Sequence, residues 1–570
     1  MSALLTSSPP PSPSLQRTVS PLPSFLEELL AEQQDLTAVE RFSQFHTGTS
    51  QPLQARYYSA LLPASPPGPG EQYAFEVDLD SCSGCKACVT ACHSLNGLDE
   101  DETWREVGLL HGGSASLPVL QHVTTACHHC LDPACMNVCP TRAYEKDAVT
   151  GIVKHLDDQC FGCQYCILAC PYEVPKYNAK RGIVRKCDMC SQRLAVGEAP
   201  ACVQACPHEA IRIAVVSKSD VAADCEVDSF LPGAPDPQYT QPTTNYKSSH
   251  PLPRNTLPAD YHSVQAEHAH WPLIIMLVLT QLSVGAFLVG QVLHTNLLGS
   301  TALAQVLPVH ALSALGFGIL SLAAATLHLG RPLLAYRAVL GLRYSWLSRE
   351  IVAFGIFAKL AAVYAAVLWF FPQLEATVWP LVLGGSVVTA GLAGVFCSIM
   401  IYVYTRRPFW SGSQTFVKFS LTTVWLGLSA VLTVSLMAAG FRESLTVGEL
   451  MADYGRWLCH GIVYVAAAKL LYEAALFRHL VSKQSTPLNR SARLMIGELA
   501  VWSRCRFAAG VIGGLALPLA MLNQSATSPG AAIAAMGLAS FGLSLIGETL
   551  ERTLFFTAAV APRMPGGLKT

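Results

Sequence analysis

Charged residues are scarce in this sequence. Asp, Glu, Lys and Arg make up 14% of its 570 residues and the formal net charge is -1, which gives no reason to expect a nucleic-acid partner. The chain has no P-loop, no dinucleotide-binding glycine fingerprint and no nucleophile elbow, so we predict no catalytic residue of its own. Its start, "MSALLTSSPPPSPSLQRTVSPLPSFL", shows neither a secretory signal nor a twin-arginine leader. We therefore expect that the N-terminal part of the chain is not exported.

The residues that are abundant divide the chain into two halves. Of the 20 cysteines, 17 precede residue 226, whereas the long apolar runs all follow residue 270. A disulfide framework is typical of small secreted domains behind a signal peptide, which is not visible here. We therefore interpret the cysteines as thiolate metal ligands in a water-exposed first half, and the second half as embedded in lipid.

The chain is predicted to contain four successive parts. The first is a Pro/Ser-rich extension, in which apolar residues recur at helical spacing over 25–46. Thr37 and Glu40 fit a capping box, which favours two short helices there. These helices either pack on their own domain or dock a partner subunit. A cysteine-rich domain, a polar linker and a membrane domain follow. The predicted boundaries are 1–73, 74–216, 217–267 and 268–570.

Eight apolar segments in the second half are long enough to cross a bilayer, which takes about 20 residues. An even number returns the C-terminus to the side of the cysteine domain. Lys and Arg accumulate in the short loops on that side, from Arg331 to Arg506, and such loops face the cytoplasm. We therefore predict a multi-pass protein of the inner membrane with the cysteine domain and both termini in the cytoplasm. The expected spans are 271–293, 304–328, 350–371, 379–403, 416–440, 455–477, 506–524 and 529–548.

Sixteen cysteines form four groups of four. The spacing C-x2-C-x2-C-x3-C-P is the bacterial ferredoxin signature, in which the fourth cysteine ligates the other cluster of a pair. Four groups therefore predict two ferredoxin-like α+β modules with four [4Fe–4S] clusters. The groups are Cys82, Cys85, Cys88 and Cys92; Cys127, Cys130, Cys135 and Cys139; Cys160, Cys163, Cys166 and Cys170; and Cys187, Cys190, Cys202 and Cys206.

Zinc is the competing metal. Structural zinc sites use separated C-x2-C pairs, which fits the second and fourth groups alone but not the first and third. Iron–sulfur clusters therefore account better for the whole pattern, and four of them in one domain indicate a chain of single-electron carriers. Basic residues near the third and fourth groups either offset the cluster charge or are ordinary surface charges: Lys154, Lys176, Lys180, Arg181, Arg185 and Lys186.

Residues 74–216 resemble the four-cluster iron–sulfur subunits of the dimethyl sulfoxide reductase family. The resemblance rests on "CSGCKACVTAC" with "TWREV", "CHHCLDPACMNVCP", "CFGCQYCILACPYEVPKYN" and "RKCDMCSQRLAVGEAPACVQACP". It implies that the first group pairs with the fourth and the second with the third. Some nitrate reductase relatives replace a third-group cysteine with Trp and hold a [3Fe–4S] cluster, whereas Cys163 is present here, which implies four cubanes.

Residues 268–556 are similar to the membrane anchor subunit of the same family. The stretches "HAHWPLIIMLVLTQLSVGAFL", "LHLGRPLLAYRAVLGLRYSWLSREI" and "IGETLERTLFF" carry this resemblance. In the family these two parts are usually separate subunits beside a molybdopterin-containing catalytic subunit. The resemblance therefore implies a natural fusion of the electron-transfer subunit and the anchor, with that catalytic subunit as partner.

Electrons on a membrane-anchored chain of clusters must enter or leave through a lipid-soluble carrier. A quinol (menaquinol or ubiquinol) needs a proton acceptor where the anchor meets the cluster domain, and ionisable residues at membrane depth are functional candidates. The anchor family places its quinol-linked histidine in the "LHLG" stretch, which corresponds to His328. The predicted quinol-binding residues are His328, Arg331, Arg349 and Glu350. A capping role for His328 and a helix-orienting role for Glu350 are the alternatives.

We predict an electron-transfer and quinol-oxidising subunit, not catalytic by itself, of an anaerobic respiratory oxidoreductase. The first alternative is a quinone-reducing dehydrogenase subunit that serves formate or a sulfur compound, and another is a nitrate reductase subunit. A redox-driven transporter is less favoured, because the spans show few buried acidic residues and no internal repeat. A haem b between His310 and His460 is a further alternative.

Overall fold

A computed structural model describes residues 38–47, 55–374, 377–441, 445–524 and 529–566, together with Glu27 and Leu30. The chain divides into two units, Met1–Ala60 and Leu61–Thr570. In the first unit, α2 spans Ala38–Thr47 and α3 spans Ala55–Tyr58. The predicted disorder of residues 1–23 and the Thr37 side of the predicted capping box lie outside the described residues.

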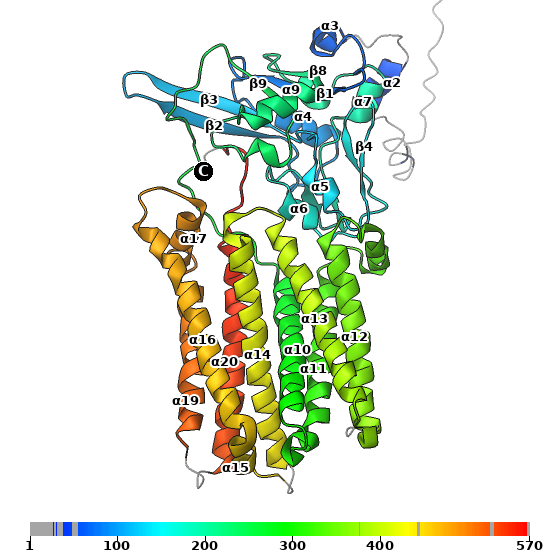
Figure 1. Cartoon of the computed structure of the whole chain (residues 1–570). Helices are drawn as coiled ribbons and strands as arrows, with labels where there is room; N and C mark the ends of the chain where they lie inside the picture. Colours follow the sequence, from blue (N-terminus) through cyan, green and yellow to red (C-terminus); the bar gives the residue numbers. More distant parts are fainter. Residues whose placement is uncertain are drawn as a thin grey trace, which may run out of the picture. The chain divides into compact units, whose positions relative to one another are not determined.

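The cysteine-rich part of the second unit is built on small β-sheets (Figure 1). Strand β1 (Glu71–Asp78) pairs antiparallel with β8 (Ile211–Ser217), which joins the start of this domain to its end. Further antiparallel pairs are β2 (Glu106–Gly113) with β3 (Pro118–Thr125), β4 (Tyr144–Lys146) with β5 (Val153–His155), and β6 (Lys176–Asn178) with β7 (Ile183–Arg185).

Short helices follow or interrupt the cysteine groups. They are α4 (Ala87–Leu95), α5 (Ala134–Asn137), α6 (Tyr165–Ala169), α7 (Ser191–Ala195), α8 (Ala201–Gln204) and α9 (Lys218–Glu226). Helix α4 packs on α8 and α5 packs on α6, so elements that are far apart in the sequence meet in pairs. The predicted ferredoxin-like α+β architecture is confirmed.

The stretch 217–267, predicted as a polar tether, is instead folded against the cysteine-rich domain. Besides α9 it contains β9 (Asn245–Lys247), which pairs parallel with β1, and β10 (Leu257–Pro258), which pairs antiparallel with β2. The sequence pattern missed both strands because two or three residues are too few to show an alternation of apolar and polar side chains.

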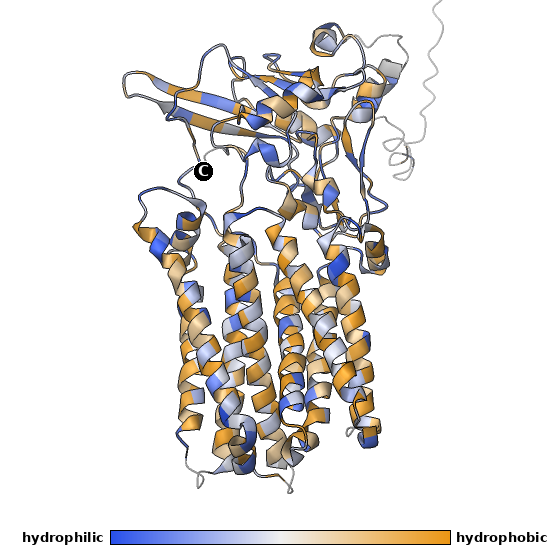
Figure 2. Ribbon diagram, in the orientation of Figure 1, coloured by the Kyte–Doolittle hydropathy of each residue, from blue (hydrophilic) through white to orange (hydrophobic). Residues whose placement is uncertain are grey.

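Eight helical segments of the second unit are long and apolar enough to span a membrane, as predicted. Figure 2 shows their mostly hydrophobic ribbons, and Figure 1 shows them running side by side. The eight segments are formed by α10 (Trp271–Asn296), α11 (Thr301–Leu327), α12 (Trp346–Phe370), α13 (Trp379–Val403), α14 (Gly412–Phe441), α15 (Val447–Leu450) together with α16 (Arg456–Ala474), α18 (Ala500–Val511) together with α19 (Leu517–Leu522), and α20 (Gly530–Thr557). Helix α17 (Pro487–Ile496) lies between the sixth and the seventh segment. Two of the eight segments contain π-helical turns, η6 (Met451–Gly455) before α16 and η8 (Ile512–Ala516) between α18 and α19.

The membrane helices form two packed groups. Helices α10 to α13 contact one another, and α14, α16, α18, α19 and α20 form a second group. Helix α10 joins the groups because it also packs on α14 and α20, and 78% of its apolar window is buried. The last helix continues nine residues past the predicted end at 548, and Glu551 and Arg552 in this extension are buried.

The cysteine-rich domain docks on the helix ends through loops between the spans. The backbone amide of Arg331 donates to the carbonyl of Phe161 at 3.0 Å, and the Tyr165 hydroxyl donates to the carbonyl of Ile401 at 3.1 Å. Gly330 lies so close to Gly182 that a Cβ at Gly330 would be 2.6 Å from the Gly182 carbonyl carbon. This close approach of two backbones places the third cysteine group directly at the membrane domain.

Candidate functional site

The first and fourth cysteine groups lie together because β1 pairs with β8 and α4 packs on α8. Cys82 interacts electrostatically with Cys85, Cys88 and Cys206. Cys92 interacts in the same way with Cys190 and Cys202, and Cys187 with Cys92, Cys190 and Cys202. Each set of four therefore combines three cysteines of one group with the last cysteine of the other. The sets are Cys82, Cys85, Cys88 and Cys206, and Cys92, Cys187, Cys190 and Cys202.

The second and third groups exchange their last cysteines in the same manner. Cys135 interacts with Cys127, Cys130 and Cys170, and these four cysteines line one cavity. Cys166 interacts with Cys139, Cys160 and Cys163. The pairing of groups is the one that the family resemblance implies, and all sixteen thiols are free of disulfides.

The surroundings of these sets suit anionic iron–sulfur clusters. The Lys186 ammonium is buried and donates to Cys127 Sγ at 3.6 Å. Burial alone would lower the pKa of Lys186, but the thiolates of Cys127, Cys135 and Cys187 raise it by more, so the pKa lies above its ordinary value. Backbone amides also donate to sulfur, for example Ala143 to Cys139 at 3.2 Å. Among the described residues no group of His, Cys, Asp or Glu is arranged to hold a metal ion directly.

Arg105 is a functional candidate that the sequence reasoning missed. Its side chain is fully buried beside Cys88 and Cys202, and the thiolates raise its pKa against the opposing effect of burial. Its guanidinium contacts the Phe75 ring at 4.6 Å and donates to Thr124 at 3.1 Å, and it forms no ion pair with a carboxylate in the described part of the chain. The only signal was its position in "TWREV". Among the predicted basic residues, Arg185, Lys180 and Lys176 form ion pairs with Glu102, Asp99 and Glu106.

A mainly apolar cavity of about 490 Å³ lies where the third cysteine group meets the membrane helices. Its walls come from both domains, with Phe161 and Cys163 on one side and α10, α11 and α12 on the other. His328 and Glu350, two of the four predicted quinol residues, line this cavity. The structure thus places a membrane-level cavity beside the cysteine set that contains Cys163.

The hydrogen bond of His328 fixes which ring nitrogen carries the proton. Its Nε2 lies 3.3 Å from the carbonyl oxygen of Cys163, and a carbonyl can only accept, so Nε2 carries the proton and donates. Nδ1 is therefore the acceptor of the neutral ring. Burial lowers the pKa of His328, and the bond to Cys163 opposes this effect.

His270 is a second histidine of this cavity that the sequence reasoning did not single out. It stands just before α10 and its ring makes an edge contact with His328, with centroids 5.9 Å apart. Burial, together with the nearby His328 and His268, lowers the pKa of His270 to about 4. The stretch "HAHW" was part of the family resemblance and is the signal that could have identified it.

The other predicted quinol residues occupy different environments. Glu350 is 3% exposed and accepts a hydrogen bond from the Ser398 hydroxyl. Arg331 donates to the carbonyls of Asp157 at 2.8 Å and Arg181 at 3.2 Å, which is a docking contact. Arg349 donates to the carbonyl of Leu342 at 3.0 Å and stacks on Trp346. His328 and Glu350 are therefore brought to one cavity, whereas both arginines hold backbone segments.

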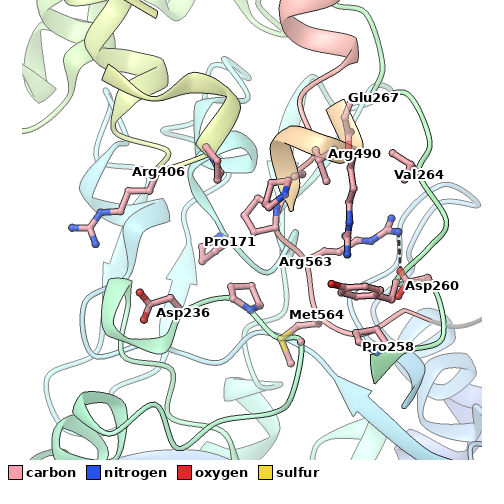
Figure 3. Close-up of a pocket in the computed structure, with 18 of the residues that line it drawn as sticks. Pro171, Asp236, Pro258, Asp260, Val264, Glu267, Arg406, Arg490, Arg563 and Met564 are labelled. Carbon is pink, nitrogen blue, oxygen red and sulfur yellow. Dashed lines mark ion pairs between the residues drawn. The ribbon is translucent and has the colours of Figure 1, made fainter. Parts of the chain in front are cut away.

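A second large cavity, of about 480 Å³, is lined by charged side chains (Figure 3). Arg563 pairs with Asp260 at 2.8 Å there, as the dashed line in Figure 3 shows. Arg490 stacks on Tyr261 and Arg406 on Tyr239, at 4.2 Å and 4.4 Å from the ring centroids. Its arginines are thus already engaged, and such a polar lining does not suit a quinol ring.

One sequence-based argument is wrong. The second helix group contains three buried glutamates, whereas the sequence reasoning expected few buried acidic residues. Arg506 Nη2 pairs with Glu473 at 3.0 Å and with Glu548 at 2.8 Å, and Lys469 also pairs with Glu548. We call these buried residues the ion cluster: Lys418, Lys469, Glu473, Arg506, Glu548, Glu551 and Arg552.

The two histidines considered for a haem also have separate surroundings. His310 is buried and its Nε2 lies 2.8 Å from Ser435 Oγ. His460 is exposed and its Nδ1 lies 2.8 Å from the carbonyl of Arg456. Each imidazole thus has a hydrogen bond to a group of its own neighbourhood.

The fold and the site define a class of protein. A ferredoxin-like domain with interleaved cysteine sets, docked on eight membrane-spanning helices, is a membrane-anchored iron–sulfur protein for electron transfer. Residues 119–216 match the family model of the 4Fe-4S dicluster domain, and residues 265–557 match that of the DMSO reductase anchor subunit (DmsC).

Curated relatives agree with this assignment. The B subunit of the anaerobic dimethyl sulfoxide reductase of Haemophilus influenzae is 38% identical over 157 residues, which are 26% of this chain and 76% of the relative. The B subunit of the Escherichia coli enzyme is 38% identical over 25% of this chain and 72% of its own length. The thiosulfate reductase electron transfer subunit PhsB of Salmonella typhi is also 38% identical, over 26% and 79%. The chain belongs to the dimethyl sulfoxide reductase family, as a fusion of the B-type iron–sulfur subunit with the DmsC anchor.

Proposed function

We propose that this protein oxidises quinol in the cavity beside Cys163 and passes the electrons through four [4Fe–4S] clusters to a separate catalytic subunit. The observation that carries the proposal is the shared cavity, in which His328 and Glu350 face the same space as Cys163. A quinol that enters from the lipid would therefore meet hydrogen-bonding groups and a cluster ligand together.

The proposed cluster ligands are the sixteen cysteines of the four interleaved sets. Their arrangement in sets of four supports this number, because each set draws three thiolates from one group and one from another. When bound, the clusters supply single-electron transfer. The set with Cys163 is the entry point because it borders the quinol cavity.

Oxidation of one quinol to quinone releases two electrons and two protons. We propose that Nδ1 of His328, the free acceptor of its ring, accepts a hydrogen bond from one quinol hydroxyl, and that Glu350 contacts the other. His270 lies against His328 and would orient its ring. Arg331 and Arg349, predicted from the sequence as quinol contacts, hold the loops around the cavity through backbone carbonyls.

The partner is proposed to be a molybdopterin-containing subunit, because relatives of both halves carry the names of reductase subunits. Equal identity to relatives named for dimethyl sulfoxide reductase and thiosulfate reductase favours a sulfoxide or another sulfur compound as the terminal acceptor. The basic loops support a cytoplasmic position of the iron–sulfur domain and both termini. A C-terminal alkaline phosphatase fusion is expected to be inactive, and high phosphatase activity would reverse this orientation.

The direct test replaces His328 in the complete complex. We expect His328→Gln to abolish quinol oxidation, while the EPR signals of the dithionite-reduced clusters keep their intensity. His294→Gln, which removes a buried histidine near the opposite end of α10, is the control and should oxidise quinol at the wild-type rate. Quinol oxidation at the wild-type rate by His328→Gln would remove this residue from the proposed site.

A further inference from the structure

The ion cluster lies inside the second helix group, next to a cavity at the end of the helices that faces the iron–sulfur domain. Lys418 is six residues from the start of α14 and Glu548 is nine residues from the end of α20. At about 1.5 Å per residue, the cluster lies about 9–14 Å below the helix ends. A cavity of about 220 Å³ reaches it and is lined by Lys418, Glu473 and Glu551, and also by Arg478 and His479.

Several polar atoms of the ion cluster have no hydrogen-bond partner among the described residues. Neither carboxylate oxygen of Glu551 accepts a hydrogen bond, and Nε and Nη1 of Arg552 and Nη1 of Arg506 donate none. Glu551 is 3% exposed and Arg552 is fully buried. Buried polar groups are normally satisfied by protein or by ordered water, so a polar cavity beside them suits water.

A stripe of polar side chains continues from the cluster along α14. Thr422, Trp425, Ser429 and Thr433 follow one another at spacings of three or four residues and therefore share one helix face. Thr422 donates to Glu548 at 2.7 Å, and Thr433 donates to the carbonyl of Gly537 at 3.0 Å, so this face meets α20.

Polar atoms in the middle of this stripe also lack hydrogen-bond partners among the described residues. Trp425 Nε1 and Ser429 Oγ on α14, and Ser544 Oγ on α20, are buried without a hydrogen-bond partner among the described residues. We call Trp425, Ser429, Thr433 and Ser544 the polar column. Figure 2 shows that hydrophilic positions interrupt the hydrophobic ribbons of α16 and α20 in this second helix group.

The polar column leads toward a hydrogen-bonded group at the opposite membrane face. Ser435, six residues before the end of α14, accepts from the Tyr454 hydroxyl at 3.0 Å and lies 2.8 Å from His310 Nε2. Ser435 itself donates to the carbonyl of Val431, so His310 Nε2 is the donor in that contact. His310 Nδ1 remains as a buried acceptor without a partner among the described residues.

An aromatic layer separates the ion cluster from the quinol cavity. Tyr402, which lines that cavity, packs on Phe419 and Phe555 with ring centroids 5.9 Å and 5.1 Å apart. The Arg552 guanidinium lies over the Phe419 ring at 3.9 Å. The two sites are therefore adjacent across this layer, and Tyr402 interacts electrostatically with Glu350 on one side and with Arg552 on the other.

We propose that the ion cluster and the polar column form a proton path through the second helix group, which moves protons from the iron–sulfur side to the opposite face while quinol is oxidised. The protons come from water at the cavity beside Glu551 and leave beside His310. No bond other than O–H and N–H bonds changes along the path, and the electrons stay on the separate route from quinol to the clusters. The driving reaction rests on the proposed quinol oxidation.

The test uses the complete complex in liposomes with the iron–sulfur domain outward, pyranine inside, and a soluble quinol and dimethyl sulfoxide outside. The interior of wild-type vesicles should acidify during turnover. In Ser429→Leu/Ser544→Leu, two apolar side chains replace unsatisfied hydroxyls and exclude water, so acidification should fall about tenfold. Ser386→Leu, at an exposed position of α13, is the matched control.

Quinol oxidation is measured in the same vesicles with a protonophore, which separates the two proposals. Equal oxidation rates with lost acidification support the path. A wild-type protein that oxidises quinol without acidifying the interior, or a Leu variant that acidifies it normally, overturns the path alone. Loss of quinol oxidation in the wild type would instead refute the proposed function.

A second measurement needs neither quinol nor turnover. The indole N–H of Trp425, identified by comparison with Trp425→Phe, should exchange with D2O within minutes in the wild type, as followed by resonance Raman spectroscopy. Exchange should be slower in Ser429→Ala/Ser544→Ala, which folds more easily than the Leu variant because it only removes unpaired hydroxyls. A fully protected indole in the wild type contradicts a hydrated column.

Discussion

Gly330→Ala should separate electron entry from cluster integrity. Gly330 lies between His328 and Arg331, where the loop after α11 meets the third cysteine group. An added Cβ would lie 2.6 Å from the carbonyl carbon and 2.7 Å from the Cα of Gly182. Both contacts are with backbone, which has no flexible end that can move aside.

The size of the effect follows from these distances. Ordinary contact begins at 3.4 Å, and the Gly182 carbonyl oxygen would lie even nearer to the added Cβ than the carbonyl carbon, so the two backbones must separate by more than about 0.8 Å. Overpacking of this kind costs about 1–3 kcal/mol, which weakens docking without unfolding the domain. Because a displacement of about 1 Å in a reacting pair can cost about 100-fold in rate, we expect quinol-driven cluster reduction to fall 10- to 100-fold.

The assay compares two ways of reducing the same clusters. Stopped-flow reduction by quinol should be slow in Gly330→Ala, whereas dithionite should give EPR signals of wild-type intensity. Gly316→Ala is the matched control, because Gly316 lies on α11, the helix that precedes Gly330, and an added Cβ there would meet nothing within 4 Å. A wild-type quinol rate in Gly330→Ala would show that the tight docking of Gly330 on Gly182 is not needed for electron entry.

Three further changes test the charges. Lys186→Met removes a cation that lies 3.6 Å from Cys127 Sγ. The attraction between these two charges is about 4 kcal/mol at an effective dielectric of about 20. Its loss should lower the reduction potential of one cluster by up to ~170 mV in an EPR redox titration. An unchanged potential would mean that this charge is screened. His270 has its pKa lowered from 6.5 to about 4, so the unfolded state binds more protons between these values and stability falls as pH drops through that window. The loss of stability is below ~1.4 kcal/mol per pH unit because the His270 ring is partly exposed. In His270→Gln the stability should depend less on pH, which thermal unfolding at pH 7 and pH 5 measures. Glu548→Leu leaves four cations against two carboxylates in the ion cluster and should cost about 3–5 kcal/mol, whereas Lys469→Leu leaves equal numbers and should cost less. Thermal unfolding in detergent checks this order, and equal losses would contradict it.

The architecture was predictable where one residue type carries a strong local pattern. Cysteines at spacings of three and four, ending in Cys170–Pro171, indicated ferredoxin loops without any knowledge of their surroundings. Apolar runs of about 20 residues predicted the spans in the same way. His328 could be proposed as a quinol residue because it ends one of these spans and lies in the "LHLG" stretch of the family resemblance. By contrast, β9 and β10 were missed because strands of two or three residues exist only through their partners, β1 and β2.

The ion cluster could not be predicted, because its charges neutralise one another across distant parts of the chain. Lys469 and Glu548 are 79 positions apart, and nothing in the sequence around either residue shows that the two side chains pair. A single charge at that depth is costly, but Lys469 and Arg506 both pair with Glu548, so the cost of burial is offset only in the folded state. Hydropathy averages treat each residue alone and therefore do not show which charged side chains meet in the folded chain. The same reasoning explains why the cluster is informative about function. A chain needing only an apolar anchor would gain stability by replacing these residues with leucine, so their presence in α16, α18 and α20 is better explained by a task that needs charge inside the membrane, such as the movement of protons.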